Sequence, residues 1–254
     1  MNHSTLNQAA KNILEHYQQL SIGGQTVRCP YYNNKRTKSR AALRVLVGKG
    51  SPSEIEEEAL LIALRKKINL AELSEEELTA FFVDNKLGVD CSAFAFYMLN
   101  AEKNGKLRKK IYIPSKNPIR KIISSLRTVE NVNVKTLVHP KNSVAVDLAQ
   151  IQAGDMITMI GTGENHNLDH VLIIEQVGYK NGGAKTISYV HSLWWKADGK
   201  YDHGIKHGII EITDNKKPLI EQQWTEAGFS KSPKNETLWR AETAKELEIR
   251  RLVV

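Results

Sequence analysis

Apolar residues recur at helical spacing in the first half of the chain, with polar residues at the intervening positions. The pattern predicts helices over residues 6–20, 40–47, 53–68, 74–86 and 118–126. Ser53 and Ser74 each precede acidic residues, which suits them as N-caps because carboxylates stabilise the first turn of a helix. Gly48 is predicted to end the second of these segments.

In the second half the pattern changes to short β-branched and apolar runs bounded by Gly, Asn or Asp. Strands are predicted over residues 156–160, 171–177, 186–191, 205–213 and 247–254. The sequence Asn181-Gly182-Gly183 is typical of a hairpin turn, so the strands on either side of it should pair antiparallel. Helices followed by consecutive strands predict an α+β fold with an antiparallel sheet.

The change of pattern also suggests how the chain is divided. We interpret residues 1–82 as a helical N-terminal extension and residues 83–254 as the main domain, with a long insertion at about 102–144. The chain length of 254 residues is enough for one large domain with such an extension. The extension is expected to be an addition to the main domain and not an independent domain.

Lys and Arg outnumber Asp and Glu by 36 to 28, which gives a net charge of +8. The basic residues gather in two segments, at 35–44 and 103–121. Such segments favour contact with polyanions, for example an acidic cell-wall polymer, anionic lipid or nucleic acid. No helix-turn-helix, zinc-finger or aromatic RNA-binding pattern accompanies them, so nucleic acid is not expected as a partner. A solvated basic face is the simplest interpretation.

The sequence contains no run of about 18 apolar residues, so no transmembrane helix is predicted. Residues 1–20 lack the apolar core of a secretory signal. A cytoplasmic protein is therefore expected, unless lysis or another route releases it to the cell wall.

The two cysteines, Cys29 and Cys91, lie far apart, and neither belongs to a CxxC or CxxH pair that would indicate structural zinc. A disulfide between them is allowed by number alone, but nothing in the sequence indicates an oxidising compartment. Two free thiols are expected, without a metal or other cofactor.

Cys91 stands at the predicted start of a helix. Asp90 precedes it as a candidate N-cap, and the apolar, helix-like stretch from Ala93 to Leu99 follows it. A helix N-terminus carries partial positive charge, so this position is expected to lower the pKa of the Cys91 thiol. The alternative is a buried, inert cysteine, which is the common fate of a lone cysteine.

Two histidines are expected near this helix start. His170 lies at the mouth of an apolar strand, and His191 lies near the end of the next strand, which should pair with the first. A single strand histidine is usually structural. Two on adjacent strands, after a cysteine at a helix start, indicate a Cys–His–His site.

In this order, Asp90-Cys91-Ser92, Gly154-Asp155, His170-Val171 and His191 resemble the motifs of the NlpC-like family of papain-fold cysteine peptidases. The resemblance covers roughly residues 83–213. It implies a nucleophile helix packed on an antiparallel sheet and hydrolysis of amide bonds in cell-wall stem peptides. It implies Cys91 as nucleophile, His170 as general base and His191 as the group that orients the base. Ala93 departs from the family pattern, which has glycine there.

The resemblance also implies that Tyr31, in Pro30-Tyr31, helps to form the site. The predicted substrate contacts are Tyr31, Asp90, Ser92, Asp169 and Trp194. Adjacent side chains on a strand point to opposite faces, so direct help from Asp169 to His170 is not expected. Trp194 either walls the cleft or packs inside the protein. His203 is expected at the surface.

The expected mechanism begins when His170 takes the thiol proton and the thiolate attacks an amide carbonyl. The backbone N–H of Cys91 would stabilise the oxyanion, and water would release the thioester. Two alternatives stay open from the sequence. The same residues could transfer the acyl group to an amine or lipid, or the domain could be a non-catalytic module that binds an anionic polymer.

Overall fold

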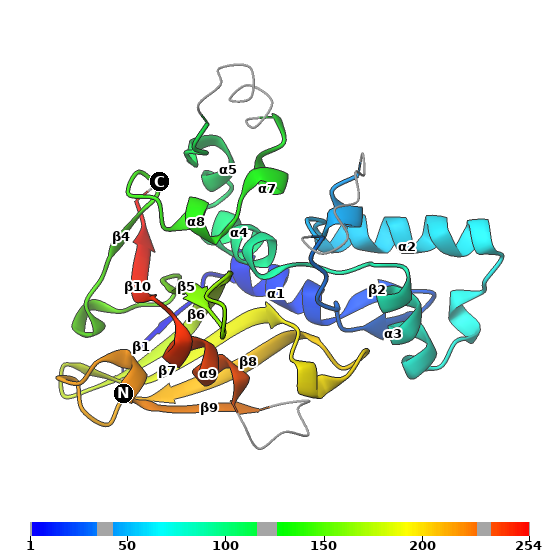
Figure 1. Ribbon diagram of the computed structural model, residues 1–254. Helices are drawn as coiled ribbons and strands as arrows, with labels where there is room; N and C mark the ends of the chain where they lie inside the picture. Colours follow the sequence, from blue (N-terminus) through cyan, green and yellow to red (C-terminus); the bar gives the residue numbers. More distant parts are fainter. Residues whose placement is uncertain (1, 35–42, 116–125, 228–234, 254) are drawn as a thin grey trace.

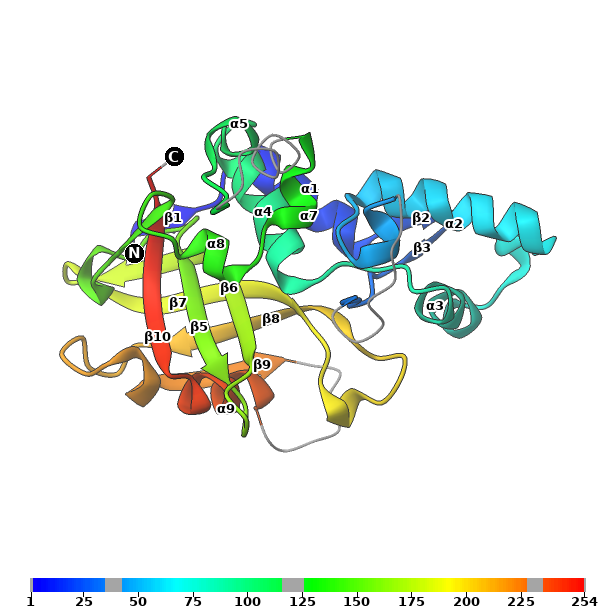
Figure 2. The same ribbon diagram turned by 45° about the horizontal axis from the view of Figure 1, so that its top comes forward.

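The computed structural model describes residues 2–34, 43–115, 126–227 and 235–253. Its centre is an antiparallel sheet with the strand order β4-β10-β5-β6-β7-β8-β9, and β1 pairs with β6 outside this order (Figures 1 and 2). The strands of this sheet are β1 (Asn2–Thr5), β4 (Ser143–Ala145), β5 (Met156–Thr162), β6 (Leu168–Lys180), β7 (Gly183–Leu193), β8 (Gly204–Glu211), β9 (Gln223–Ala227) and β10 (Glu246–Leu252). A separate hairpin consists of β2 (Leu20–Ile22) and β3 (Gln25–Val27). The predicted class, helices with an antiparallel sheet, is confirmed.

The hairpin between β6 and β7 forms as the sequence predicts. Asn181 and Gly182 have positive φ angles of 54° and 80°, which the two central residues of a type I′ turn require. The ladder between the two strands runs away from this turn as far as the pair Ile173 and Val190. Beyond that pair the two strands no longer bond to each other, and the candidate site lies at this end.

The helices that the structure describes are α1 (Gln8–Gln18), α2 (Pro52–Lys66), α3 (Glu75–Asp84), α4 (Cys91–Glu102), α5 (Leu107–Lys110), α7 (Thr128–Asn131), α8 (Val134–Leu137) and α9 (Glu236–Thr243). The predicted cap of α3, Ser74, is confirmed by a capping box with Glu77. The predicted cap of α2, Ser53, was wrong by two residues. Ser51 caps it, because Pro52 occupies the first helical position, where its missing N–H costs nothing.

Two other predicted helices differ from the structure. Of the segment 40–47, Val45–Val47 forms one turn of 3-10 helix, which Gly48 ends in the left-handed conformation, and residues 40–42 lie outside the described residues. The predicted helix at 118–126 also lies outside them, apart from Leu126. No described helix is long and apolar enough to cross a membrane.

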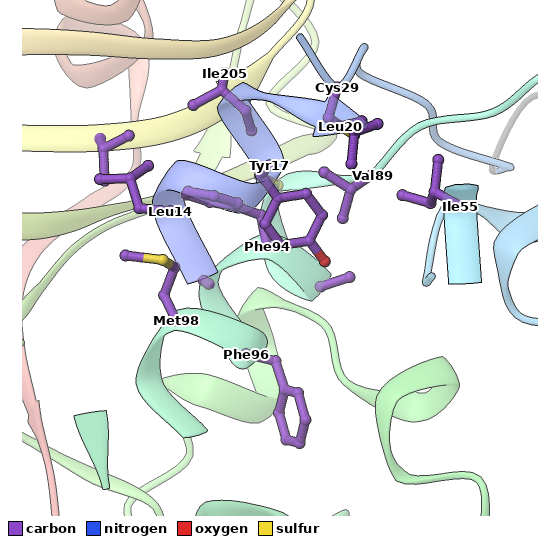
Figure 3. Packing of buried hydrophobic residues seen from close by; sticks show 14 of the residues in the cluster. Leu14, Tyr17, Leu20, Cys29, Ile55, Val89, Phe94, Phe96, Met98 and Ile205 are labelled. Carbon is purple, nitrogen blue, oxygen red and sulfur yellow. The ribbon is translucent and has the colours of Figure 1, made fainter. Parts of the chain in front are cut away.

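The core has two parts, one on each face of the sheet. On one face α1 and α4 pack together, with the Tyr17 and Phe94 rings edge to face at 5.4 Å between centroids (Figure 3). On the other face the strands pack against Trp224 of β9 and Ala241 of α9. Helix α4 is therefore held between α1 and the sheet, and α9 covers the opposite face.

The first eighteen residues share this core with the rest of the chain. β1 pairs with β6 in the sheet, and α1 packs on α4. Helices α2 and α3 lie farther out, to one side of the sheet (Figure 1). The division of the chain near residue 82 stays a prediction. β1 and α1 precede this point in the sequence, but they pack with the sheet and α4, which follow it. In the predicted insertion, α5 and α7 pack on α4, and α8 packs on β5 and β6.

Candidate active site

Helix α4 begins at Cys91, as the sequence predicts. Asp90 has the extended backbone of an N-cap, and its carboxylate accepts a hydrogen bond from the Ala93 N–H at 2.8 Å. The helix is apolar on nearly every side, so its first turn is buried along with the rest. Cys91 keeps only 6% of its surface exposed.

The segment that leads into α4 occupies the gap where β6 and β7 separate. The Ser192 hydroxyl of β7 donates to the Val89 carbonyl at 2.8 Å. On the other side, the Val171 N–H of β6 donates a hydrogen bond to the Cys91 sulfur, which lowers the pKa of this otherwise buried thiol. The sulfur therefore lies against the peptide unit that joins His170 to Val171.

The pKa of Cys91 is raised to about 12, mainly by burial and then by the adjacent Asp90 carboxylate. Lys49, Arg240 and the Val171 N–H act in the opposite direction. The expectation of a lowered pKa was wrong, because burial and the Asp90 carboxylate raise the pKa more than these neighbours lower it. The thiol is protonated at neutral pH.

His170 and His191 form a hydrogen-bonded pair, which confirms their predicted proximity. Nε2 of His170 lies 2.8 Å from Nδ1 of His191, and both side chains are buried. On its other side, Nε2 of His191 lies 3.2 Å from Oε1 of Glu226, whose side chain is fully buried. The Tyr189 hydroxyl donates to the second oxygen of Glu226 at 2.9 Å. Hydrogen bonds thus connect His170, His191 and Glu226 in one chain, and Tyr189 is bonded to its end.

The order of donors in this line follows from the charge of Glu226. Burial raises the pKa of Glu226, but interaction with His191 together with hydrogen bonds from His191, Thr237 and Tyr189 gives a net lowering, so the carboxylate is ionised. It therefore accepts the Nε2 proton of His191, and when His191 is neutral its Nδ1 is left as an acceptor. His170 must then donate from Nε2, and its Nδ1 carries no proton. This tautomer is the one a general base needs.

The side chains of Cys91 and His170 reach the end of β6 from different sides. His170 and Val171 alternate along the strand, and Val171 packs in the core with α4, so the His170 side chain leaves the strand on the other face. No hydrogen bond joins Cys91 to His170 among the described residues. Burial is the main reason why the pKa of His170 lies well below its usual value, and positive charge on Arg240, or on His191 when it is protonated, lowers it further, so the ring is neutral at rest.

Lys49, which the sequence analysis did not select, forms an ion pair and hydrogen bonds at the start of α4. Its buried ammonium donates to the Asp90 carboxylate at 2.8 Å, to the Ser92 hydroxyl at 2.7 Å and to the Val132 carbonyl at 2.8 Å. Ser92 also donates to Asp90 at 2.9 Å. Asp90 and Ser92 are thus occupied by internal partners, and their role as substrate contacts stays a prediction.

Tyr31 lies close to the segment that leads into α4. Its backbone forms a parallel bridge with Val89, and its N–H donates to Nδ1 of His203 at 3.1 Å. Burial raises the pKa of the Tyr31 phenol, and the neighbouring Cys91 and Asp90 raise it further. The phenol is therefore a neutral group beside the thiol. His203 is buried, so its predicted surface position was wrong: it supports the Tyr31 backbone from inside.

Two other predicted contacts point elsewhere. Asp169 accepts a hydrogen bond from the Gly161 N–H at 3.1 Å, on the side of the strand away from His170, as alternation predicts. The Trp194 indole donates to the Gly199 carbonyl at 3.0 Å within its own loop. A contact of either residue with substrate stays a prediction.

Cys29 and Cys91 are both free and buried, so they form no disulfide. The described residues contain no group of three or more His, Cys, Asp or Glu side chains placed to hold a metal ion. Comparison with protein-family models, with curated proteins and with solved structures finds no match to this chain.

Proposed function

We propose that this protein is a cysteine hydrolase that cleaves an amide bond, with Cys91 as nucleophile, His170 as general base and His191 as the residue that orients the base. One observation carries the proposal. A buried line of hydrogen bonds from Glu226 through His191 fixes the tautomer of His170, at the strand end where the next N–H contacts the Cys91 sulfur. The resemblance of the motifs to NlpC-like peptidases supports the same roles.

The resting site holds a neutral thiol and a neutral imidazole, so the proton moves when substrate binds and not before. Nδ1 of His170 accepts the thiol proton while the sulfur forms a bond to the carbonyl carbon. The new positive charge on His170 is stabilised through His191 by the Glu226 carboxylate. This step requires Nδ1 of His170 to come within hydrogen-bond distance of the Cys91 sulfur. Such a contact often forms only in the substrate complex.

The oxyanion needs donors at the start of α4. Asp90 accepts from the Ala93 N–H, whereas no described residue accepts from the Cys91 N–H, which is one of the first helical N–H groups without an internal partner. That N–H is the proposed oxyanion donor. His170 returns its proton to the leaving amine, and water then hydrolyses the thioester to the free acid and the thiol.

The proposed substrate class is a peptide or isopeptide of the bacterial cell wall, as the motif resemblance implies. The basic residues of α5, Arg108, Lys109 and Lys110, are exposed and suit an anionic polymer. Transfer of the acyl group to an amine instead of water uses the same residues and gives an amide product when an amine is added.

A second candidate function is a binding module without catalysis. The 6% exposure of Cys91 and its raised pKa favour this alternative, because both are ordinary for an inert buried cysteine. The basic surface would then be the functional feature, and Cys91 would only fill the core.

Digestion of purified muropeptides, with new ends identified by mass spectrometry, separates the two candidates. Cys91→Ser is expected to abolish cleavage without loss of fold, measured by circular dichroism and thermal unfolding. Cys29→Ala is the matched control, since it also alters a buried cysteine and should retain turnover. Full cleavage by the Cys91→Ser protein would refute the hydrolase, and binding without cleavage by the unmodified protein would favour the module.

A further inference from the structure

Arg240 is a charged residue at the site for which the proposed mechanism has no use. It lies on α9, which Asn235 caps by accepting from the Leu238 N–H at 3.0 Å. At the other end of the helix, the Thr243 hydroxyl accepts from the Gly163 N–H at 3.0 Å, in the turn between β5 and β6. The helix that carries Arg240 is thus fixed at both ends.

One buried donor of the Arg240 guanidinium has no hydrogen-bond partner. This donor is the Nε atom, and no described carboxylate forms an ion pair with the guanidinium. Arg251 shows the usual arrangement, with Nε and Nη2 donating to the two oxygens of Asp155 at 2.7 and 2.8 Å. A buried donor on a charged group is costly to leave unsatisfied, so the orphan atom in Arg240 requires an explanation.

The surroundings of Arg240 place it at the candidate active site. Burial has the largest effect on the pKa of Tyr31, Cys91 and His170: it raises the first two and lowers the third. The positive charge of Arg240 lowers the pKa of all three groups. These three groups come from a loop, from α4 and from β6, and they share Arg240 as a neighbour. None of the three carries a negative charge at rest, and the Glu236 carboxylate on the same helix, which raises the pKa of Arg240, forms no ion pair with it among the described residues.

We propose that Arg240 binds a carboxylate of the substrate, so that the site selects amides with a free carboxylate close to the scissile bond. The inference rests on the proposed hydrolase and names its substrate class. A guanidinium presents parallel N–H donors that match the two oxygens of a carboxylate. The arriving anion supplies the partner that Nε lacks and fixes the distance from the carboxylate to the sulfur.

Two small alkylating reagents test this without knowledge of the natural substrate. Iodoacetate and iodoacetamide both form a thioether at a cysteine sulfur and release iodide, but only iodoacetate carries a carboxylate. The ratio of their second-order rates at Cys91, followed by mass spectrometry of the Cys91 peptide at pH 9, reports recognition of the charge. Changes in the reactivity of the thiol itself cancel in the ratio.

Arg240→Gln is expected to lower the iodoacetate-to-iodoacetamide ratio about tenfold, and Arg240→Lys to lower it less, because charge-assisted hydrogen bonds are of this strength. Arg108→Gln is the matched control, since it removes one exposed positive charge of the same type on α5. An unchanged ratio in Arg240→Gln, or an equal fall in Arg108→Gln, would overturn the proposal.

Protection of the unmodified protein gives a second measurement that needs no variant. N-acetylglycine is expected to slow iodoacetamide at Cys91, whereas N-acetylglycinamide at the same concentration is not. Equal protection by the two compounds would contradict a carboxylate site while leaving the hydrolase intact. Failure of both reagents to modify Cys91 in the folded protein would contradict the hydrolase itself, and the carboxylate site with it.

Discussion

Glu226 affects the protonation of two histidines although it lies two hydrogen bonds away from His170, the proposed base. Its carboxylate requires a donor from His191, and that requirement passes through the ring to His170. Without the carboxylate, each histidine is able to hold its proton on either nitrogen. A single buried charge therefore removes the unproductive tautomers.

Glu226→Gln is expected to leave the fold intact and to lower kcat/KM roughly ten- to a hundredfold, because His170 then carries its Nδ1 proton for part of the time. Nitrogen-15 NMR of the histidine rings should show one tautomer of His170 in the unmodified protein and a mixture in the variant. Tyr189→Phe, which removes only the donor to the other Glu226 oxygen, should keep one tautomer. A single tautomer in Glu226→Gln would refute the relay.

Lys49→Met is expected to destabilise the protein by roughly 3–5 kcal/mol, because it leaves Asp90 as a buried and uncompensated charge. Urea unfolding at pH 7 measures the loss. Lys200→Met is the matched control, since Lys200 pairs with Asp84 at the surface, and no measurable change is expected there. Recovery of part of the loss in the double variant Lys49→Met with Asp90→Asn would show that the uncompensated charge is the cause.

The sequence identifies the part of the site that has a motif and misses the part that does not. Cys91, His170 and His191 could be selected because a helix cap and apolar strands surround them. Glu226 and Arg240 could not, because β9 and α9 have no apolar run and reach the site only through tertiary packing. The pKa of Cys91 also could not be predicted, since burial on every side of a helix depends on the whole fold.

At the scale of single elements, helix starts show how two similar signals compete. Ser51 and Ser53 each stand three residues before a glutamate, so both match the capping-box pattern. Pro52 decides between them, because its fixed φ angle and missing N–H suit the first helical position and a cap must precede it. In the structure, Ser51 and Glu54 exchange the two hydrogen bonds of the box.

Ser51→Ala is expected to lower the free energy of unfolding by about 1 kcal/mol, the usual cost of losing an N-cap. Ser53→Ala should have no destabilising effect, because Ser53 is an exposed residue inside the helix, where alanine is the better helix former. Urea unfolding of the two variants under the same conditions compares them directly. A larger loss in Ser53→Ala would show that the helix starts two residues later than described.

Strand prediction succeeded where apolar residues are dense and failed where they are sparse. The central strands β5, β6, β7 and β8 and the later β10 are all confirmed, with ends that differ by a few residues. β1 was missed because its sequence, Asn-His-Ser-Thr, is polar and lies at the exposed edge of the sheet. Such a strand forms because β6 offers it a partner and not through its own composition.

For the molecule as a whole, buried neutral histidines make stability depend on pH. Burial lowers the pKa of His203 to about 4 and that of His170 well below its usual value. An unfolded histidine has a pKa of about 6.5. As the pH falls below that value, the unfolded chain binds protons that the folded chain does not, so acid favours unfolding.

The free energy of unfolding is therefore expected to fall between pH 7 and pH 5, with about 2 kcal/mol of the loss due to His203 alone. Urea unfolding at the two pH values measures it. His203→Asn should reduce the loss, whereas His3→Asn, at an exposed position, should not. Equal or greater stability at pH 5 would contradict the neutral, buried state of these rings.

The insertion of β10 between β4 and β5 has a consequence for synthesis on the ribosome. β5 cannot complete its pairing until residues 246–252 have left the exit tunnel, and β1 must wait for β6 to arrive. Glu226 and Arg240 are also translated after both histidines. A nascent chain thus contains Cys91 long before the other residues of the proposed site, which is complete only after Arg240 has left the exit tunnel.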